Sequence, residues 1–311
     1  MRFSHSVLAA CVLLGIAVLT LTPPGFTAPR VTTIEQGMTM RGAAEFLDAE
    51  GIVLSHTLVR LVSFVRRADT LVKAGSYAFE RPIGAWEAVA RLARGDFGIE
   101  TLRVRLAEGS TREQMAIVLA DALPRFDPSE FLTLTEGREG YLFPDTYFLS
   151  QLATAREVAE LLLDTFSTRT ETLAGTIALS GRTLGEVVTM ASIVEREAHD
   201  PADQRLIAGV LWNRLDIGMA LQADATLFYL LGKPSRELTQ EDLETDSPFN
   251  TYRYPGLPPA PIGNPGLGAI EASLSPTPSD YLYYLSDERG VTHYAETFEE
   301  HKENRARYLN Q

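Results

Sequence analysis

The spacing of hydrophobic residues along the chain predicts short helices separated by short strands. Thr39 and Ser55 lie at positions typical of helix N-caps, and each precedes apolar residues at helical spacing. Strand-like stretches lie at 31–34, 75–79 and 102–106, and the last of these alternates apolar with basic residues. The pattern therefore predicts an α+β chain that begins with a small region of mixed helices and strands.

The chain changes character after residue 138. Clusters of aromatic, proline and glycine residues at 139–147, 247–266 and 281–294 alternate with helical segments from there on. Long loops of this composition commonly carry functional residues on a rigid scaffold. We therefore predict a domain boundary near residue 138, with the chemistry in the part that follows.

The N-terminal segment 7–21 is almost unbroken apolar sequence, preceded by Arg2. Its fifteen residues fall slightly short of the roughly 17–25 that usually span a bilayer. A cleaved signal peptide would place Ala28 at the cut, a lipoprotein signal would use Cys11, and an uncleaved signal anchor would keep the whole segment. We favour the anchor, in which residues 1–28 form the membrane helix and linker and the remaining chain lies outside the cytoplasm.

The charge balance and the cysteine and histidine content exclude several classes of function. The 41 acidic residues outnumber the 28 basic ones, giving a formal charge of −13, whereas nucleic-acid binding needs a basic face. The single cysteine, Cys11, lies in the apolar N-terminal segment, so the remaining chain forms no disulfide. The five histidines show no short metal-ligand spacing, which argues against a zinc enzyme. We therefore expect no metal, no cofactor and no nucleic-acid partner.

A helix expected over 183–198 carries the residue with the clearest chemical role. Thr183 and Glu186 form a capping-box pattern, which supports a helix start at this point. At about 100° per residue, Glu195 shares one face of this helix with aliphatic and small residues. These residues are Leu184, Val188, Ala191 and Ala198.

A carboxyl group on such a face loses hydration when it ionises, so its pKa rises and it stays protonated near neutral pH. A general acid requires this protonated state. Helix geometry alone leaves an alternative equally open, in which Glu195 is buried and paired with a nearby arginine such as Arg214.

Six motifs in the second part of the chain resemble those of one known family. They are ASIVERE at 191–197, EGYLFPDTY at 139–147, NRL at 213–215 with LQAD at 221–224, SPFNTY at 247–252, GLPPAPIGNPG at 256–266, and YLYY at 281–284 followed by His293 and His301. In composition and order these motifs resemble the endolytic murein transglycosylase family, the MltG or YceG-like proteins. The N-terminal plan of the chain is similar to that family's LysM-like region.

The resemblance implies a division of the chain and a single catalytic residue. It implies a signal anchor and linker over 1–28, a LysM-like peptidoglycan-binding region over 29–138, and a YceG-like catalytic transglycosylase domain over 139–311. Glu195 corresponds to the first glutamate of the family's signature helix, so the resemblance implies that it is the catalytic acid. The sequence departs from the family's pattern at three alanines that bear on loop shape: Ala223, Ala225 and Ala260.

Other residues of the motifs are candidates for binding the glycan. The candidate substrate-binding residues are Glu139, Tyr147, Gln222, Asp224, Asn250 and Tyr252. All of these except Asp224 also have a structural interpretation. Glu139 would form a loop salt bridge, the amides of Gln222 and Asn250 would satisfy loop backbone, and the two tyrosines would pack in the core. Asp224 would orient Gln222.

The resemblance implies an endolytic lytic transglycosylase that cleaves the β-1,4 bond between N-acetylmuramate and N-acetylglucosamine and leaves 1,6-anhydro ends. Glu195 would be the single general acid and base of this reaction. One alternative is a non-catalytic peptidoglycan-binding protein of cell-wall assembly. Another is a hydrolytic muramidase, which would need a second carboxylate opposite Glu195, with Glu139 or Asp224 as candidates.

The expected partners follow from the same resemblance. They are peptidoglycan glycan strands, the membrane through the N-terminal helix, and glycan synthases of the elongation or division machinery. We expect a single-pass protein of the bacterial cytoplasmic (inner) membrane, with its catalytic domain on the extracytoplasmic, periplasmic side. A short linker after the apolar segment agrees with a site close to the bilayer.

Overall fold

The computed structural model describes residues 23, 26–27, 30–68, 72–98 and 101–309, and the chain divides into two compact units. The first unit contains 1–102, 122–126 and 148–157, and the second contains 103–121, 127–147 and 158–311. Helices and strands are mixed throughout both units, as expected for an α+β chain.

The predicted boundary near residue 138 lies inside the second unit. The reason is long-range pairing that the local sequence pattern does not reveal. The backbone N–H of Gly109 donates to the carbonyl of Asn264 at 2.8 Å, and the N–H of Asn264 donates to the carbonyl of Ser110 at 2.9 Å. Residues 103–121 therefore belong with the later part of the chain.

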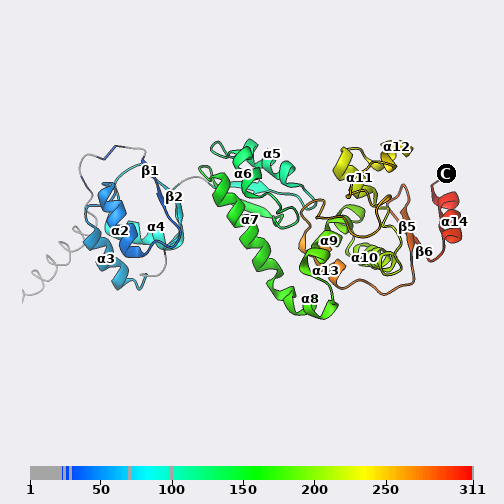
Figure 1. The fold of residues 1–311 in the computed structure, drawn as a ribbon. Coiled ribbons are helices and arrows are strands. Elements are labelled where there is room, and N and C mark those ends of the chain that lie inside the picture. The colour runs from blue at the N-terminus through cyan, green and yellow to red at the C-terminus, as the bar shows by residue number, and fades with distance from the viewer. Residues whose placement is uncertain (1–22, 24–25, 28–29, 69–71, 99–100, 310–311) are drawn as a thin grey trace, which may run out of the picture. The chain divides into compact units, whose positions relative to one another are not determined.

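The first unit places three helices around a two-stranded antiparallel sheet (Figure 1). The strands are β1 (Arg30–Ile34) and β2 (Gly75–Phe79), and the helices are α2 (Met40–Ala49), α3 (His56–Val65) and α4 (Ala85–Arg94). Thr39 caps α2, because its hydroxyl accepts the N–H of Gly42 at 3.2 Å. The predicted strands at 31–34 and 75–79 and the helix starts at Thr39 and Ser55 are confirmed.

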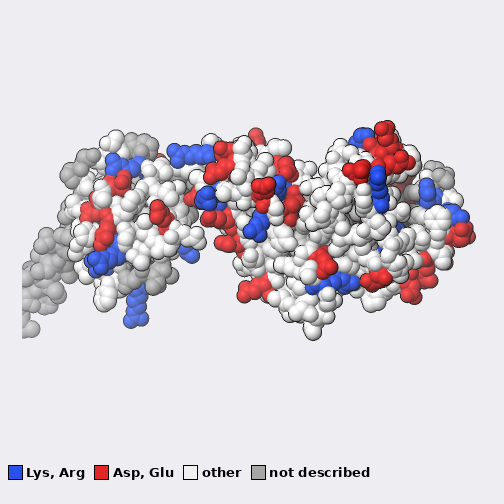
Figure 2. Space-filling view, viewed as in Figure 1, with Lys and Arg blue, Asp and Glu red and all other residues white. Residues whose placement is uncertain are grey.

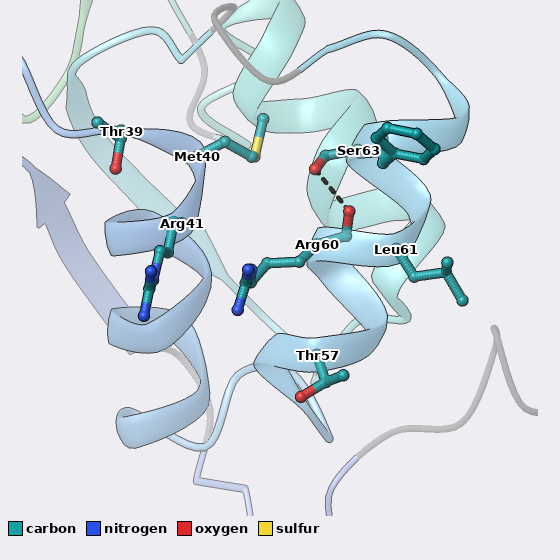
Figure 3. A pocket seen from close by; sticks show the side chains of 8 residues that line it. Thr39, Met40, Arg41, Thr57, Arg60, Leu61 and Ser63 are labelled. Atoms are coloured by element: carbon teal, nitrogen blue, oxygen red, sulfur yellow. Dashed lines mark hydrogen bonds between the residues drawn. The ribbon is translucent and has the colours of Figure 1, made fainter.

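An open cavity of about 540 Å³ lies between α2 and α3 (Figure 3). Arg41 of α2 and Arg60 of α3 both line it, and the side chain of Arg60 points toward α2. Phe64, also on the cavity wall, leaves 73% of its surface exposed. The cavity is thus a partly apolar surface with two cationic groups. The assignment of this region as LysM-like stays a prediction.

The second unit is mainly helical. Its helices are α5 (Arg112–Ala122), α6 (Pro128–Leu134), α7 (Ala155–Thr170), α8 (Ala174–Ser180), α9 (Leu184–Glu197), α10 (Pro201–Asp216), α11 (Asp224–Leu231), α12 (Gln240–Leu243), α13 (Leu267–Leu274) and α14 (Phe298–Tyr308), with short 3₁₀ turns at Glu171–Leu173 and Ser235–Glu237. Strand β3 (Thr101–Arg105) pairs with β4 (Thr146–Ser150), and β5 (Tyr283–Ser286) forms a hairpin with β6 (Thr292–Ala295).

Helix α9 is the central element of the second unit. Its start is the predicted capping box, because the Thr183 hydroxyl accepts the N–H of Glu186 at 3.2 Å and the Glu186 carboxylate accepts the N–H of Thr183 at 2.7 Å. Every residue from Val187 to Glu195 is buried. One side of α9 packs on α10 and another on α13 (Figure 1). The helix is therefore apolar on two sides and held rigidly.

Within the residues that the structure describes, no single helix is long and apolar enough to cross a bilayer. The stretches Ala155–Ser180 and Leu184–Glu197 together have the length and apolar composition of a membrane span. A bend of 107° separates them. The predicted anchor over 1–28 lies almost entirely outside the described residues.

The acidic character of the chain is visible on the surface of the second unit (Figure 2). Exposed carboxylates gather on and around α12, where Glu237, Glu241 and Glu244 all face solvent. This surface disfavours the binding of polyanions such as nucleic acids.

Candidate active site

Glu195 lies in the last turn of α9, and its side chain is only 8% exposed. Its carboxyl oxygen Oε2 accepts the backbone N–H of Gly266 at 2.9 Å. One turn earlier, the hydroxyl of Ser192 accepts the N–H of Ile262 at 3.0 Å. The segment 262–266 therefore runs along α9 and covers the glutamate.

The structure does not show the alternative pairing of Glu195 with Arg214. The guanidinium of Arg214 donates instead to the carbonyls of Leu282 at 2.6 Å and Leu221 at 2.5 Å. The positive charge of Arg214 acts on Glu197 instead, where it favours the ionised carboxylate. Glu197 also accepts a hydrogen bond from the Tyr284 hydroxyl at 3.0 Å. Glu195 and Glu197 therefore face different partners.

Burial is the largest influence on the ionisation of Glu195, and it raises the pKa of this carboxyl above its usual range. The hydrogen bond from Gly266 offsets part of this rise, because it stabilises the charged form. The negative charge of Glu108 raises the pKa further, and His199 lowers it. The balance favours a protonated Glu195, which is the state that a general acid needs.

A close approach of two backbone segments forms one wall beside Glu195. A Cβ atom added to Gly263 would lie 2.6 Å from the carbonyl oxygen of Gly109, so this contact admits only glycine. A Cβ atom added to Gly109 would in turn lie 3.4 Å from Cγ of Glu195. The loop at Gly109 therefore rests directly against the glutamate side chain.

Asn264 joins three loops at this wall, and its side chain is fully buried. Its Oδ1 accepts the backbone N–H groups of Gly140 and Leu142, both at 2.9 Å. Its Nδ2 donates to the carbonyl of Ser110 at 2.9 Å and to Oε1 of Glu139 at 2.7 Å. The amide thus makes four hydrogen bonds to loops far apart in the sequence. The sequence interpretation did not select Asn264, although it lies in one of the six motifs.

Glu139 belongs to the same network and is 7% exposed. Its carboxylate accepts the N–H of Arg112, at the start of α5, at 3.2 and 3.3 Å from its two oxygens. Burial raises the pKa of Glu139 to about 7, against the lowering effect of these bonds. Glu139 therefore supports the loops in this structure, and its predicted contact with glycan stays a prediction.

Gln222, Asp224 and Tyr252 form a cluster near Glu197, whose carboxyl is influenced by the negative charge of Asp224. The Tyr252 hydroxyl donates to the Asp224 carboxylate, and the N–H of Gln222 donates to the carbonyl of Thr251 at 3.1 Å. Gln222 is exposed and adopts a left-handed backbone with φ of 49°. Such a conformation is uncommon for a residue other than glycine and is often found at functional sites.

Asn250 and Tyr147 take structural positions. The buried amide of Asn250 donates to the carbonyls of Leu243 and Thr245 at 3.0 and 2.9 Å and accepts the N–H of Tyr252 at 3.0 Å. The hydroxyl of Tyr147, which is 7% exposed, donates to the carbonyl of Phe143 at 2.7 Å. Both side chains use their polar atoms inside the protein.

Arg196 connects the loop at Gly109 with helix α11. Its guanidinium donates to the carbonyl of Gly109 at 3.2 Å and lies over the ring of Phe228 in α11, 4.4 Å from the ring centroid. The next residue of α11, Tyr229, lies close enough to Glu139 and Arg112 for their charges to act on its hydroxyl. Helix α11, which begins beside Gln222, therefore borders the same region as Glu195 and the loops that cover it.

The sequence of this chain is similar to those of known bacterial proteins. The chain is 29% identical over 304 residues to the "Endolytic murein transglycosylase" of Bacillus subtilis, covering 89% of this chain and 84% of that protein. It is 36% identical over 178 residues to the protein of the same name from Streptococcus pneumoniae. That match covers 55% of this chain but 32% of the longer relative.

A solved structure and a family profile agree with these matches. The crystal structure of a putative YceG-like protein from Listeria monocytogenes superposes with a TM-score of 0.61 at 26% sequence identity, covering 89% of this chain and 99% of that one. The profile of the YceG-like family matches residues 32–307, which include Glu195 and the loops that contact it. On this evidence the chain belongs to the YceG-like family.

Proposed function

We propose that this chain is a peptidoglycan lytic transglycosylase that cuts within glycan strands, with Glu195 as its single general acid and base. The observation that carries the proposal is the environment of Glu195, which is buried, bonded to the N–H of Gly266 and, among the described residues, in no ion pair with Lys, Arg or His. The names of the curated relatives support the same activity. The bond to be cleaved is the β-1,4 link from N-acetylmuramate to N-acetylglucosamine.

The first half of the reaction uses the proton of Glu195. The carboxyl donates it to the glycosidic oxygen while the bond from that oxygen to the anomeric carbon of N-acetylmuramate breaks. The N-acetylglucosamine unit leaves as an alcohol, and positive charge develops on the muramate ring. The N–H of Gly266 stabilises the carboxylate that remains on Glu195.

The second half of the reaction restores the acid. The Glu195 carboxylate takes the proton of the muramate 6-hydroxyl, whose oxygen attacks the anomeric carbon of the same sugar and closes a 1,6-anhydro ring. No water enters and no covalent enzyme intermediate forms, so the atoms of the substrate are conserved. Intramolecular attack has a high effective concentration, and one acid–base group is therefore sufficient.

The cluster of Gln222, Asp224 and Tyr252 supplies groups suited to a sugar polymer. The exposed amide of Gln222 offers both a donor and an acceptor for an N-acetyl or hydroxyl group. Asp224 and Tyr252 bond to each other, which fixes the position of the tyrosine ring beside Gln222. We assign glycan binding to these three residues and loop support to Glu139, Asn250 and Tyr147.

The hydrolytic alternative is less well supported by the residues first considered for it. Glu139 is buried and accepts bonds from Arg112 and Asn264, and Asp224 accepts a bond from Tyr252. A carboxylate that activates water needs an open side toward the sugar. Glu139 and Asp224 both have carboxylate oxygens engaged in hydrogen bonds within the protein, so neither is well placed to act as a general base toward water.

The proposal is tested by product analysis with the full chain in detergent and uncrosslinked glycan strands. Mass spectrometry should find anhydro-muramate ends with the unmodified chain and at least about a hundredfold fewer with Glu195→Gln, since general acid catalysis contributes at least that factor. The matched control is Glu160→Gln, an exposed glutamate on α7, which should cleave normally. Reducing muramate ends would identify a muramidase, and no cleavage by the unmodified chain would favour a binding protein.

We also propose that residues 1–28 anchor the chain in the cytoplasmic membrane and that glycan synthases are its partners. Within the predicted LysM-like region 29–138, we assign glycan binding outside the cytoplasm to the part that belongs to the first unit. The apolar run at 7–21 and the cell-wall substrate support this placement. Protease added outside spheroplasts should degrade a chain that sediments with the membrane. A protected or soluble chain would contradict the anchor.

A further inference from the structure

A second carboxylate, that of Glu108, lies near Glu195. Glu108 is not part of any of the six sequence motifs. Glu108 precedes Gly109. A Cβ atom added to Gly109 would lie 3.4 Å from Cγ of Glu195, so Gly109 is next to the glutamate side chain. A Cβ atom added to Gly266 would lie 1.9 Å from Oε1 of Glu108, so the Glu108 carboxylate rests against this glycine. The N–H of the same Gly266 donates to Glu195 at 2.9 Å. The two carboxyl groups therefore meet at one residue, Gly266.

The groups that face Glu195 come from three elements. The loop before α5 contributes Glu108, whose charge opposes ionisation of Glu195. Helix α9 and the turn after it contribute His199, which favours ionisation, while Arg196 of the same helix is bonded to Gly109. The segment 262–266 contributes only the N–H of Gly266. Among the described residues, Glu108 is thus the neighbour that opposes loss of the proton from Glu195.

We propose that Glu108 is a positioning residue for cleavage: its carboxylate, held against Gly266, keeps the proton on Glu195 and so sets the upper pH limit of the reaction. This inference rests on the proposed function. Glu108 is exposed, so water solvates its charge, whereas burial disfavours a charge on Glu195. Two nearby carboxyl groups in such different surroundings can divide their roles in acid–base catalysis.

The same arrangement serves both halves of the reaction. Before cleavage, the negative charge of Glu108 makes Glu195 retain its proton until the glycosidic oxygen takes it. After proton transfer, both groups are negative and repel each other, which makes Glu195 a stronger base toward the 6-hydroxyl. Glu108 itself neither gains nor loses a proton, so the balance of the reaction is unchanged.

The test compares full chains in detergent and measures the rate of anhydro-end formation against pH. In Glu108→Gln the basic limb of the profile should move to lower pH, while the rate on the acidic side is kept. Each half-unit of this movement lowers the rate on the basic limb by roughly threefold. The matched control is Glu271→Gln, an exposed glutamate on α13, which should leave the limb in place.

A second variant reaches the same carboxylate from the other side. Gly266 has φ of −72° and ψ of 168°, so its backbone accepts alanine, but the added Cβ would displace the Glu108 carboxylate. Gly266→Ala should therefore move the basic limb in the same direction as Glu108→Gln. The double variant should move it no further than the larger of the two single changes.

A direct titration separates this inference from the proposed function. With ¹³C-labelled glutamate, the carboxyl signal that disappears in Glu195→Gln belongs to Glu195, and its midpoint should be lower in Glu108→Gln than in the unmodified chain. An unchanged midpoint overturns the inference, as does an equal loss of rate at every pH. If the unmodified chain makes no anhydro ends, the proposed function fails, but the titration still decides the role of Glu108.

Discussion

At the scale of single residues, burial gives two glutamates of the site opposite tasks. Glu195 is covered on one side by Gly266 and faces Gly109, and its proton is the reactive one in the proposed mechanism. Glu139 accepts bonds from Arg112 and Asn264 and holds loops together. Both have a raised pKa because of burial, so a perturbed carboxyl alone does not identify the acid.

Glu139 should make the stability of the protein depend on pH. Its pKa rises from 4.5 to about 7 on folding, so the folded state binds the proton more tightly than the unfolded chain. Stability is then greatest below the unfolded value and falls as pH increases through the interval between the two. Between about pH 5 and pH 8, this group should lower the free energy of unfolding by about 2 kcal/mol.

Glu139→Gln removes this titration and is the variant that checks the prediction. Urea unfolding at both pH values should show a smaller decrease in stability than in the unmodified chain, by about the same 2 kcal/mol. Glu195 titrates in both proteins and cancels in the comparison. Equal decreases in the two proteins would show that Glu139 is not the group responsible.

At the scale of elements, the site depends on a glycine contact between the loop at Gly109 and the segment 262–266. Alanine at Gly263 would place Cβ 2.6 Å from the Gly109 carbonyl oxygen, and a backbone atom cannot move aside like a flexible side chain. Gly263→Ala should therefore cost about 1–3 kcal/mol of stability and reduce cleavage, because the loop that faces Glu195 is displaced.

Gly268 provides the control for this change. It lies in α13, and an added Cβ would meet only Oε1 of Gln204 at 3.6 Å, an ordinary contact. Gly268→Ala should leave the stability unchanged or increase it by about 0.5–1 kcal/mol, because alanine favours a helix. Thermal unfolding of both variants, with cleavage assays, distinguishes a specific contact from a general intolerance of alanine.

At the scale of the whole molecule, local signals in the sequence predicted elements better than boundaries. Thr39 and Thr183 cap helices that were expected, because a cap and the apolar spacing after it lie within a few residues. The boundary near residue 138 was placed by a change in composition. It falls within one unit because Gly109 and Ser110 pair with Asn264, a contact between residues far apart in the chain.

For the candidate site as well, the sequence predicted single residues but not the contacts between distant loops. Glu195 was predicted from helical spacing and from a motif, and its burial agrees with that prediction. The contacts that define its surroundings, from Glu108, Gly266 and Asn264, come from loops whose meeting point no local pattern encodes. Gln222 was selected from its motif, but its left-handed backbone becomes visible only in the structure.

The hydrogen bond from Gly266 to Glu195 joins residues 71 positions apart, and this separation links catalytic competence to synthesis of the chain. A nascent polypeptide that ended before 262 would present helix α9 without its cover. Water would then reach the carboxyl, which would ionise at an ordinary pH and have no proton to give. In the proposed mechanism, cleavage therefore begins only when the chain has been made and folded beyond residue 266.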